Sequence, residues 1–220
     1  MIKYIHPTSV EGLKNLPTNF IFPSHFLGLI VGKPGTGKTS LLKFMLQSDD
    51  LFFKKFNRIL IVSPSTIEYS DLFLHPSDLH PELNLEWIEE KLGELKNTKN
   101  YCNVLLILDD VVADLKTEST NKRLLSLIFN RRHKLNNGMV SIIVTSQKYK
   151  TLPTAMRVAA SFIVTFPISP SEISTIQDEL VYSNINLEKI ASRVFTNDKT
   201  FIVLNITNNK IYHEFGEINN

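Results

Sequence analysis

Short runs of apolar residues recur along this chain, and polar or turn-forming residues close each run. Uninterrupted runs of this kind predict β-strands that are buried on both faces of a sheet. The runs cover residues 26–31, 59–62, 103–108, 139–145 and 161–166. Elsewhere, apolar residues return at helical spacing, which predicts helices with one buried face. These helices are expected directly after residue 39 and at 84–96, 120–133, 152–157, 170–180 and 187–194.

Strands that alternate with helices predict an α/β fold, in which helices flank a mainly parallel central sheet. Near the end of the chain, two further runs at 201–206 and 210–215 flank Asn208-Asn209, a pair that is typical of a hairpin turn. We therefore expect the sheet to finish in a C-terminal β-hairpin.

The pattern predicts a single domain over residues 1–220. Residues 1–25 contain several prolines and a glycine, so we expect an irregular N-terminal segment that packs on the core. Residues 167–220 are expected to supply the C-terminal helices and hairpin.

A glycine-rich stretch lies between the first apolar run and the first predicted helix. It reads GKPGTGKT over Gly32–Thr39, and a strand, a glycine-rich turn and a helix in this order are the context of a phosphate-binding P-loop. The glycines let successive N–H groups curl around an anion, and the helix N-terminus adds its dipole. We expect Lys38 to reach the β- and γ-phosphates of ATP, and the Thr39 hydroxyl to bind Mg²⁺. The expected nucleotide-binding residues are Gly32, Lys33, Pro34, Gly35, Thr36, Gly37, Lys38, Thr39 and Ser40.

Two carboxylates end the apolar run at 103–108. The carboxyl end of a central parallel strand opens into the ligand cleft of an α/β fold, so Asp109 and Asp110 are expected beside the P-loop. In P-loop enzymes an acid at this place holds Mg²⁺, and a following acid activates the attacking water. We assign the first role to Asp109 and the second to Asp110.

Gln147 follows the run at 139–145, where its amide can hydrogen-bond the γ-phosphate or the attacking water. A polar residue on the strand after the acid strand is typical of the RecA/FtsK-like P-loop class, in which an extra strand separates the P-loop strand from the acid strand.

Three arginines are candidates for a finger that acts on a neighbouring subunit's nucleotide. Arg131 and Arg132 end the helix predicted at 120–133, where they could equally complement the helix dipole. Arg157 could be a second finger candidate, a DNA contact or a surface cation.

Composition narrows the classes of function. The chain has 220 residues and a net charge of +2, so a grip on nucleic acid must come from a local cluster or from several subunits together. Cys102 is the single cysteine, which indicates a reducing compartment. No apolar run is long enough for a signal peptide or a membrane span. We expect a soluble protein with no membrane partner.

The motifs together resemble those of a known family. GKPGTGKTSLL, LLILDDV, the basic RRHK stretch and SIIVTSQKYKTLPTAMR are similar to the genome-packaging ATPases of large double-stranded DNA viruses. These include poxviruses, giant viruses, virophages and polinton-type elements, a branch of the FtsK/HerA superfamily of DNA translocases. The resemblance covers residues 26–166, and its most particular part is the run that contains Ser146, Gln147, Tyr149, Leu152, Pro153 and Arg157.

The resemblance implies an ATP-hydrolysing motor that drives double-stranded DNA into a preformed capsid. It implies a homo-oligomeric ring of roughly five or six subunits, a capsid or vertex protein as partner, and a place in the host cytoplasm, the virus factory or the virion. ATP and Mg²⁺ are the expected cofactors. Our candidates for a DNA-facing surface are Lys116, Lys122 and Arg123.

Three alternatives stay open at this point. A helicase or plasmid-mobilisation translocase would use the same ATPase machinery on a different nucleic-acid substrate. A nucleotide-gated scaffold would bind ATP with little turnover, although a pure switch needs no water-activating acid such as Asp110. A small-molecule kinase would be expected to carry an arginine-rich lid, which the sequence does not show.

Overall fold

The fold is a central sheet with helices on both faces. The computed structural model describes residues 25–49, 51–72, 74–111, 117–181, 185–213 and 216–218, and within these ranges nine strands form one sheet in the order β3-β2-β4-β5-β1-β6-β7-β8-β9. The strands are β1 (Leu27–Val31), β2 (Arg58–Val62), β3 (Leu79–His80), β4 (Cys102–Leu108), β5 (Gly138–Ser146), β6 (Phe162–Thr165), β7 (Ile202–Asn205), β8 (Lys210–His213) and β9 (Gly216–Glu217). The helices are α1 (Lys38–Gln47), α2 (Leu85–Lys96), α3 (Glu118–Phe129), α4 (Thr154–Val158), α5 (Pro170–Leu180) and α6 (Leu187–Val194).

The order of the strands decides where the functional side chains meet. β5 lies between β1, which leads into the glycine-rich loop, and β4, which ends in the two aspartates, and it is parallel to both. Leu29 of β1 is paired with Val144 of β5, and Ile143 of β5 with Ile107 of β4. The carboxyl ends of β1, β5 and β4 therefore open on one edge of the sheet, as the sequence predicts for the RecA/FtsK-like class.

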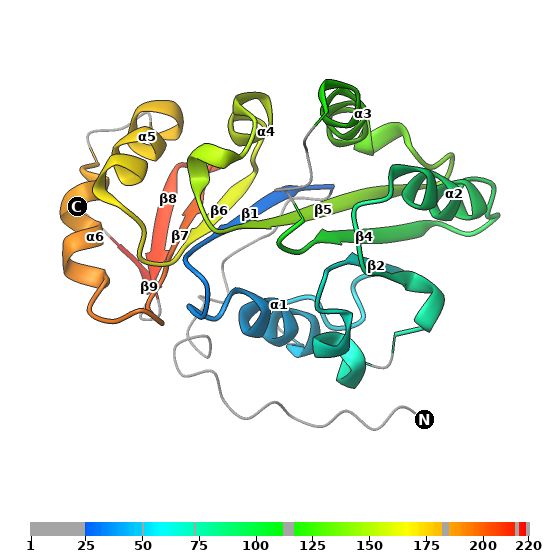
Figure 1. The fold of residues 1–220 in the computed structure, drawn as a ribbon, viewed down its shortest axis with the longest axis horizontal. Coiled ribbons are helices and arrows are strands. Elements are labelled where there is room, and N and C mark those ends of the chain that lie inside the picture. The colour runs from blue at the N-terminus through cyan, green and yellow to red at the C-terminus, as the bar shows by residue number, and fades with distance from the viewer. Residues whose placement is uncertain are drawn as a thin grey trace.

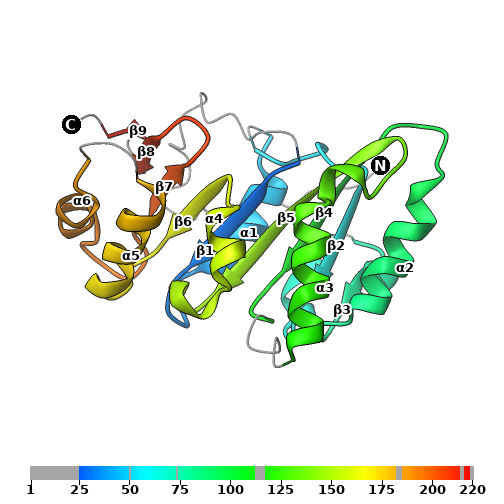
Figure 2. The same ribbon diagram turned by 90° about the horizontal axis from the view of Figure 1, so that it is seen from above.

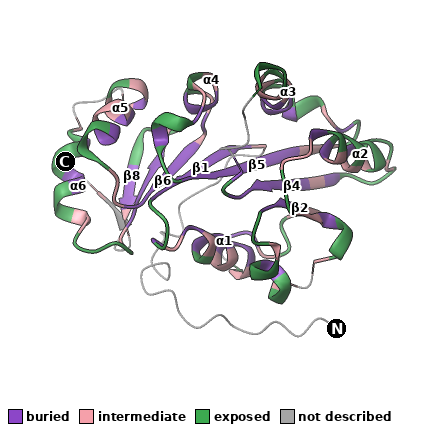
Figure 3. Cartoon of the chain, in the orientation of Figure 1, coloured by how far each residue is buried: buried purple, intermediate pink, exposed green. Residues whose placement is uncertain are grey.

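Side chains of the strands divide between two cores because successive residues of a strand point to opposite faces. Leu27, Leu29 and Val31 of β1 pack in the core that α2, α3, α4, α5 and α6 cover. Ile30 packs in the other core, with α1 and a group of aromatic residues. Figure 1 shows α1 below the sheet and α2–α5 above it, and the buried strands lie between the exposed sides of the helices (Figure 3).

The C-terminal part extends the sheet in the antiparallel sense. β7 pairs antiparallel with β6, and β8 with β7, which confirms the predicted hairpin. Seen from above, α5 and α6 gather at the β7–β9 end of the sheet, whereas α2 lies at the opposite end (Figure 2). No described helix is both long and apolar enough to cross a membrane.

Several predicted elements match closely, and others differ for local reasons. α2 begins after Asn84, whose side chain accepts a hydrogen bond of 3.0 Å from the N–H of Trp87 and so caps the helix. α3 ends at Phe129, earlier than predicted, because the Asn130 side chain bonds back to the Ser126 carbonyl at 2.9 Å. A 3-10 turn follows at Arg131–His133.

Two regions of the sequence gave no clear pattern. Between β2 and α2 the chain forms 3-10 turns at Thr66–Leu72 and Pro76–Asp78 and the two-residue edge strand β3, which is too short to leave a periodic signal. Residues 1–24 of the N-terminal segment predicted at 1–25 lie outside the described residues.

Candidate functional site

The loop from Gly32 to Gly37 has the geometry that the motif predicts. Gly35 has φ of +76° and Gly37 of +104°, a region that residues with a Cβ adopt only with strain. Gly32 is needed for a different reason, since a Cβ there would lie 2.7 Å from both the Cβ of Phe166 and the Oγ1 of Thr36. The loop therefore packs tightly against Phe166, the residue that directly follows β6.

Lys38, the first residue of α1, is buried under this loop. Its Nζ donates hydrogen bonds of 2.8 Å to the carbonyl of Gly32 and 3.1 Å to that of Lys33. Burial lowers the pKa of Lys38, and the charges of Asp110 and Asp109 oppose that shift. The ammonium is thus held at the centre of the loop by weak carbonyl acceptors, which phosphate oxygens can replace.

Asp109 is 4% exposed and lies at the end of β4 among hydroxyl groups. Its Oδ2 accepts from the hydroxyls of Tyr69 at 2.7 Å, Thr39 at 3.3 Å and Ser63 at 3.3 Å. Its Oδ1 accepts from Thr145 at 2.7 Å. These four donors fix the orientation of the carboxylate. The contact with Thr39 places the two expected metal ligands side by side.

Asp110 is displaced from the line of the strand. Its φ is +57°, and its N–H donates to the Thr145 hydroxyl at 2.8 Å. The Gln147 amide nitrogen donates to Oδ2 of Asp110 at 2.9 Å. The ends of β4 and β5 thus place the two residues expected to handle water in direct contact. An aspartate with positive φ at such a place is strained backbone that the surrounding bonds hold.

The sequence motifs do not include the residues that surround them in the structure. Tyr69 comes from a segment without a pattern, so nothing pointed to it. Ser63 and Thr145 had a weak signal, because each is a hydroxyl residue at or near the end of an apolar strand. Lys199 comes from the turn before β7, and its Nζ donates to the carbonyl of Gly35 in the loop.

A cavity of about 160 Å³ adjoins the glycine-rich loop at Thr36 and Gly37. It lies between the first turn of α1 and the rings of Phe166 and Phe201, whose centroids are 5.6 Å apart. Lys199 forms part of its rim. Walls of this kind favour a flat aromatic group as the occupant, since aromatic rings attract one another in stacked or tilted arrangements.

Two of the predicted finger arginines are occupied within the chain. Arg131 is 8% exposed, and its guanidinium donates to the carbonyls of His25 at 2.7 Å and Ile128 at 2.8 Å. Arg157 is also buried, forms an ion pair of 3.1 Å with Glu179 and lies 5.0 Å from the ring centroid of Tyr149. Both side chains are therefore engaged inside their own chain, and their assignment as fingers stays a prediction.

Arg132 is exposed beside Arg131. Both lie at the edge of the sheet where β1 begins, because Arg131 contacts His25, whereas the glycine-rich loop follows the end of β1. A strand of this length separates the two edges by about 16 Å. Arg132 is therefore too far to serve its own chain's loop, and a role there requires a second copy.

The predicted DNA-facing cations are also mostly paired. Lys122 forms an ion pair with Glu118, and Arg123 bridges α3 to α2 through Glu86 and Glu89, the latter at 2.9 Å. These ion pairs engage both side chains in the free chain, and their assignment to a DNA-facing surface stays a prediction. Lys116 lies outside the described residues.

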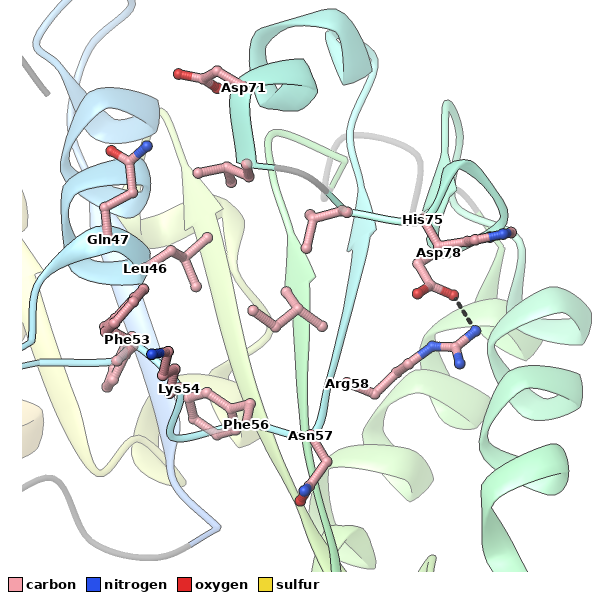
Figure 4. Close-up of a pocket in the computed structure, with 14 residues that line it drawn as sticks. Leu46, Gln47, Phe53, Lys54, Phe56, Asn57, Arg58, Asp71, His75 and Asp78 are labelled. Carbon is pink, nitrogen blue, oxygen red and sulfur yellow. Dashed lines mark hydrogen bonds and ion pairs between the residues drawn. The ribbon is translucent and has the colours of Figure 1, made fainter. Parts of the chain in front are cut away.

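A separate cavity of about 300 Å³ lies where α1 ends and β2 begins, on the far edge of the sheet from the glycine-rich loop. Figure 4 shows the ion pair between Arg58 and Asp78 on one of its walls, with an Nη2–Oδ1 distance of 2.7 Å. The hydrogen bond to Asp78 raises the pKa of Arg58. The pair ties β2 to the turn before β3, which is a structural role.

These features define a P-loop NTPase. The glycine-rich loop with Lys38 and Thr39 follows β1, and the two acids follow β4. Because β5 lies between these two strands, the protein belongs to the class in which an extra strand separates the P-loop strand from the acid strand. Comparison with protein families agrees with this class. Residues 17–215 match the family described as Poxvirus A32 protein. The chain belongs to this family. No curated protein matches the chain significantly.

Solved structures share the fold at low sequence identity. The genome packaging NTPase B204 from Sulfolobus turreted icosahedral virus 2, in complex with sulfate, is 19% identical with a TM-score of 0.62, covering 87% of this chain and 96% of that one. The DNA-packaging ATPase B204 of Sulfolobus Turreted Icosahedral Virus is 18% identical, with a TM-score of 0.60 and coverage of 87% and 98%. The pCW3 conjugation coupling protein TcpA is 12% identical, with a TM-score of 0.53 and coverage of 82% and 57%.

Proposed function

We propose that this protein is an ATP-hydrolysing motor that moves double-stranded viral DNA into a preformed capsid. The observation that carries the proposal is the contact between Asp110 and Gln147, at 2.9 Å, beside the P-loop. A protein that binds nucleotide merely as a switch has no need for a carboxylate and an amide in this arrangement. Membership of the Poxvirus A32 family and the shared fold with two viral packaging NTPases support the viral role.

The phosphates of ATP would lie in the loop, with the N–H groups of the first turn of α1 and the ammonium of Lys38 around them. Thr39 and Asp109 would hold Mg²⁺, and their hydroxyl and carboxylate oxygens, 3.3 Å apart, are the hard donors that this ion prefers. The ion would neutralise charge on the β- and γ-phosphates. Tyr69, Ser63 and Thr145 keep the Asp109 carboxylate oriented for this task.

Hydrolysis requires one water in line with the γ-phosphate. The water oxygen forms a bond to the γ-phosphorus while the bond to the β–γ bridging oxygen breaks, so that ADP and phosphate leave. Asp110 accepts the proton of that water, and Gln147 orients it. The bond between Asp110 and Gln147 would then sense whether the phosphate is present.

The nucleoside would extend into the cavity between the first turn of α1 and the rings of Phe166 and Phe201. The Thr39 side of the loop faces Asp109 and marks the terminal phosphates, whereas Ser40 faces the cavity and marks the other end of the nucleotide. The base would stack on the two rings, and Lys199 would exchange its bond to Gly35 for a phosphate oxygen.

The assembly belongs to the same proposal. A ring of about five or six copies would let Arg132 of one subunit act on the nucleotide of the next, and a capsid or vertex protein would hold the ring in place. The motor would work in the host cytoplasm, a virus factory or the virion. A helicase or a mobilisation translocase remains the rival, and stimulation by blunt duplex without strand separation would distinguish packaging from it.

The test of the chemistry is ATP turnover by purified protein. We expect Asp110→Asn to lower kcat by about 100-fold or more, which is the usual contribution of a general base, with little change in ATP affinity. Lys38→Ala and Asp109→Ala are expected to abolish hydrolysis. Lys189→Ala, which removes an exposed lysine on α6, is the control. Unchanged turnover in the Asp110 variant would contradict the catalytic assignment.

A further inference from the structure

A cleft of about 400 Å³ opens on the same edge of the sheet as the P-loop. One wall is formed by Lys33 and Pro34 of the loop, and the second by Gln147, Lys148 and Lys150 after β5. The third side is closed around the start of α5 by Ile168, Ser169, Ser171 and Glu172. The cleft thus adjoins both the P-loop and Gln147.

Its charged side chains are almost all positive. Lys33, Lys148 and Lys150 are exposed, and within the described ranges none of them forms an ion pair, in contrast to Lys43 and Lys122. The one carboxylate on the wall, Glu172, is 8% exposed and accepts hydrogen bonds from the Lys150 N–H at 3.4 Å and the Ser169 hydroxyl at 3.3 Å. The cleft therefore offers a local positive field despite the small net charge of the chain.

The turn that carries two of these lysines is firmly held. The carbonyl of Lys148 accepts hydrogen bonds from the hydroxyls of Ser146 at 2.8 Å and Thr151 at 2.7 Å. Tyr149 points inward between the two lysines, and its hydroxyl donates to Glu179 at 2.9 Å. Burial, and then the neighbouring carboxylate, raises the pKa of Tyr149. Lys148 and Lys150 consequently project from a fixed base, and their backbone loses little freedom when they bind a ligand.

We propose that this cleft receives the phosphodiester backbone of duplex DNA, with Lys148 and Lys150 as the cations that contact phosphate and the Ser171 hydroxyl as a further donor. The assignment rests on the proposed function and replaces the paired Lys122 and Arg123 as the DNA surface. Phosphate contacts supply most of the sequence-independent affinity of DNA-binding proteins. Two lysines in each subunit suffice if several subunits grip one duplex.

The position of the turn also connects DNA binding to ATP hydrolysis. Gln147, which bonds Asp110, directly precedes Lys148. A phosphate that pulls on Lys148 acts on a rigid turn, so the displacement reaches the Gln147 amide and the bond that positions the attacking water. DNA in the cleft would thereby alter hydrolysis, and loss of the γ-phosphate would alter the grip on DNA.

The experiment measures binding of a fluorescent blunt-ended duplex by the full chain over a range of salt concentrations. The test variant combines Lys148→Gln with Lys150→Gln. The control combines Lys96→Gln with Lys99→Gln, two exposed lysines near the opposite edge of the sheet, and so removes the same charge. A third protein with Lys148→Arg and Lys150→Arg keeps the charge and the donors, and thermal melting verifies that all of them fold.

We expect the test variant to bind the duplex about tenfold more weakly or worse at low salt, and its plot of log K against log salt to be shallower by about two for each subunit engaged. The arginine protein and the control should bind within about twofold of the parent chain. The ratio of DNA-stimulated to basal ATP turnover should fall in the test variant alone.

Equally weak duplex binding by the test variant and the control would overturn the proposal, because net charge alone would then explain the loss. A polyglutamate competitor provides a second check. If the test variant loses polyglutamate binding and keeps duplex binding, the cleft takes an acidic protein segment and the DNA assignment is wrong. Either result leaves the ATPase proposal intact, since that proposal depends on turnover and on Lys38, Asp109 and Asp110.

Discussion

At the scale of single residues, the site consists of groups whose surroundings differ sharply. Asp109 is buried among hydroxyl donors and suits a fixed metal ligand, whereas exposed Asp110 has a strained backbone and one amide partner, which suits proton transfer. The same reasoning separates the arginines. Arg131 donates to two carbonyls inside the chain, and its neighbour Arg132 does not share that burial.

Arg131→Ala is expected to destabilise the protein by about 2–4 kcal/mol, because it leaves the carbonyls of His25 and Ile128 without their donor in a buried place. Arg132→Ala should change stability by about 0.5 kcal/mol or less, as is usual at the surface. Urea unfolding measures both values. In mixed rings, wild-type subunits should restore the ATP turnover of Arg132→Ala subunits. A stable but inactive Arg131 variant that wild-type subunits rescue would instead make Arg131 the finger.

At the scale of elements, the sequence predicted most of what the structure contains. β1, β4 and β5 were recognisable because a strand buried on both faces has to be apolar throughout, and α5 and α6 because their apolar spacing is regular. The P-loop, Asp109, Asp110 and Gln147 followed, since each lies at the end of such a strand. Tyr69 and Lys199 could not be predicted, because they reach the site from loops whose path depends on tertiary packing.

The close packing between β1 and β6 can be tested directly by mutation. A Cβ at Gly28 would lie 2.2 Å from Cζ of the buried Phe162 ring. Gly28→Ala is therefore expected to lower the free energy of unfolding by about 1–3 kcal/mol through overpacking, and Phe162→Leu in the same chain should recover part of the loss.

Gly93 provides the matched control. It lies on the exposed side of α2, and a Cβ there meets nothing within 4 Å. Gly93→Ala should stabilise the protein by about 0.5–1 kcal/mol through helix propensity. Chemical denaturation of the two variants compares them directly. A neutral Gly28→Ala would mean that β1 and β6 are less tightly packed than described.

At the scale of the whole molecule, one edge of the sheet carries every group that we expect to act on the nucleotide or DNA bound by its own chain. The P-loop follows β1, the acids follow β4, Gln147 and the lysine turn follow β5, and Lys199 precedes the antiparallel β7. This arrangement lets nucleotide and DNA contact the same short segments. Arg132 lies at the other edge and therefore fits a role between copies.

The most direct test of the central claim is steady-state ATP hydrolysis with and without linear double-stranded DNA, at low and high salt, with Lys38→Ala as the blank. Our account predicts a rate that duplex DNA increases, that high salt returns to the basal level because phosphate contacts are screened, and that the Lys38 variant loses entirely. Robust hydrolysis that is indifferent to duplex DNA at every salt concentration would contradict a DNA-translocating motor.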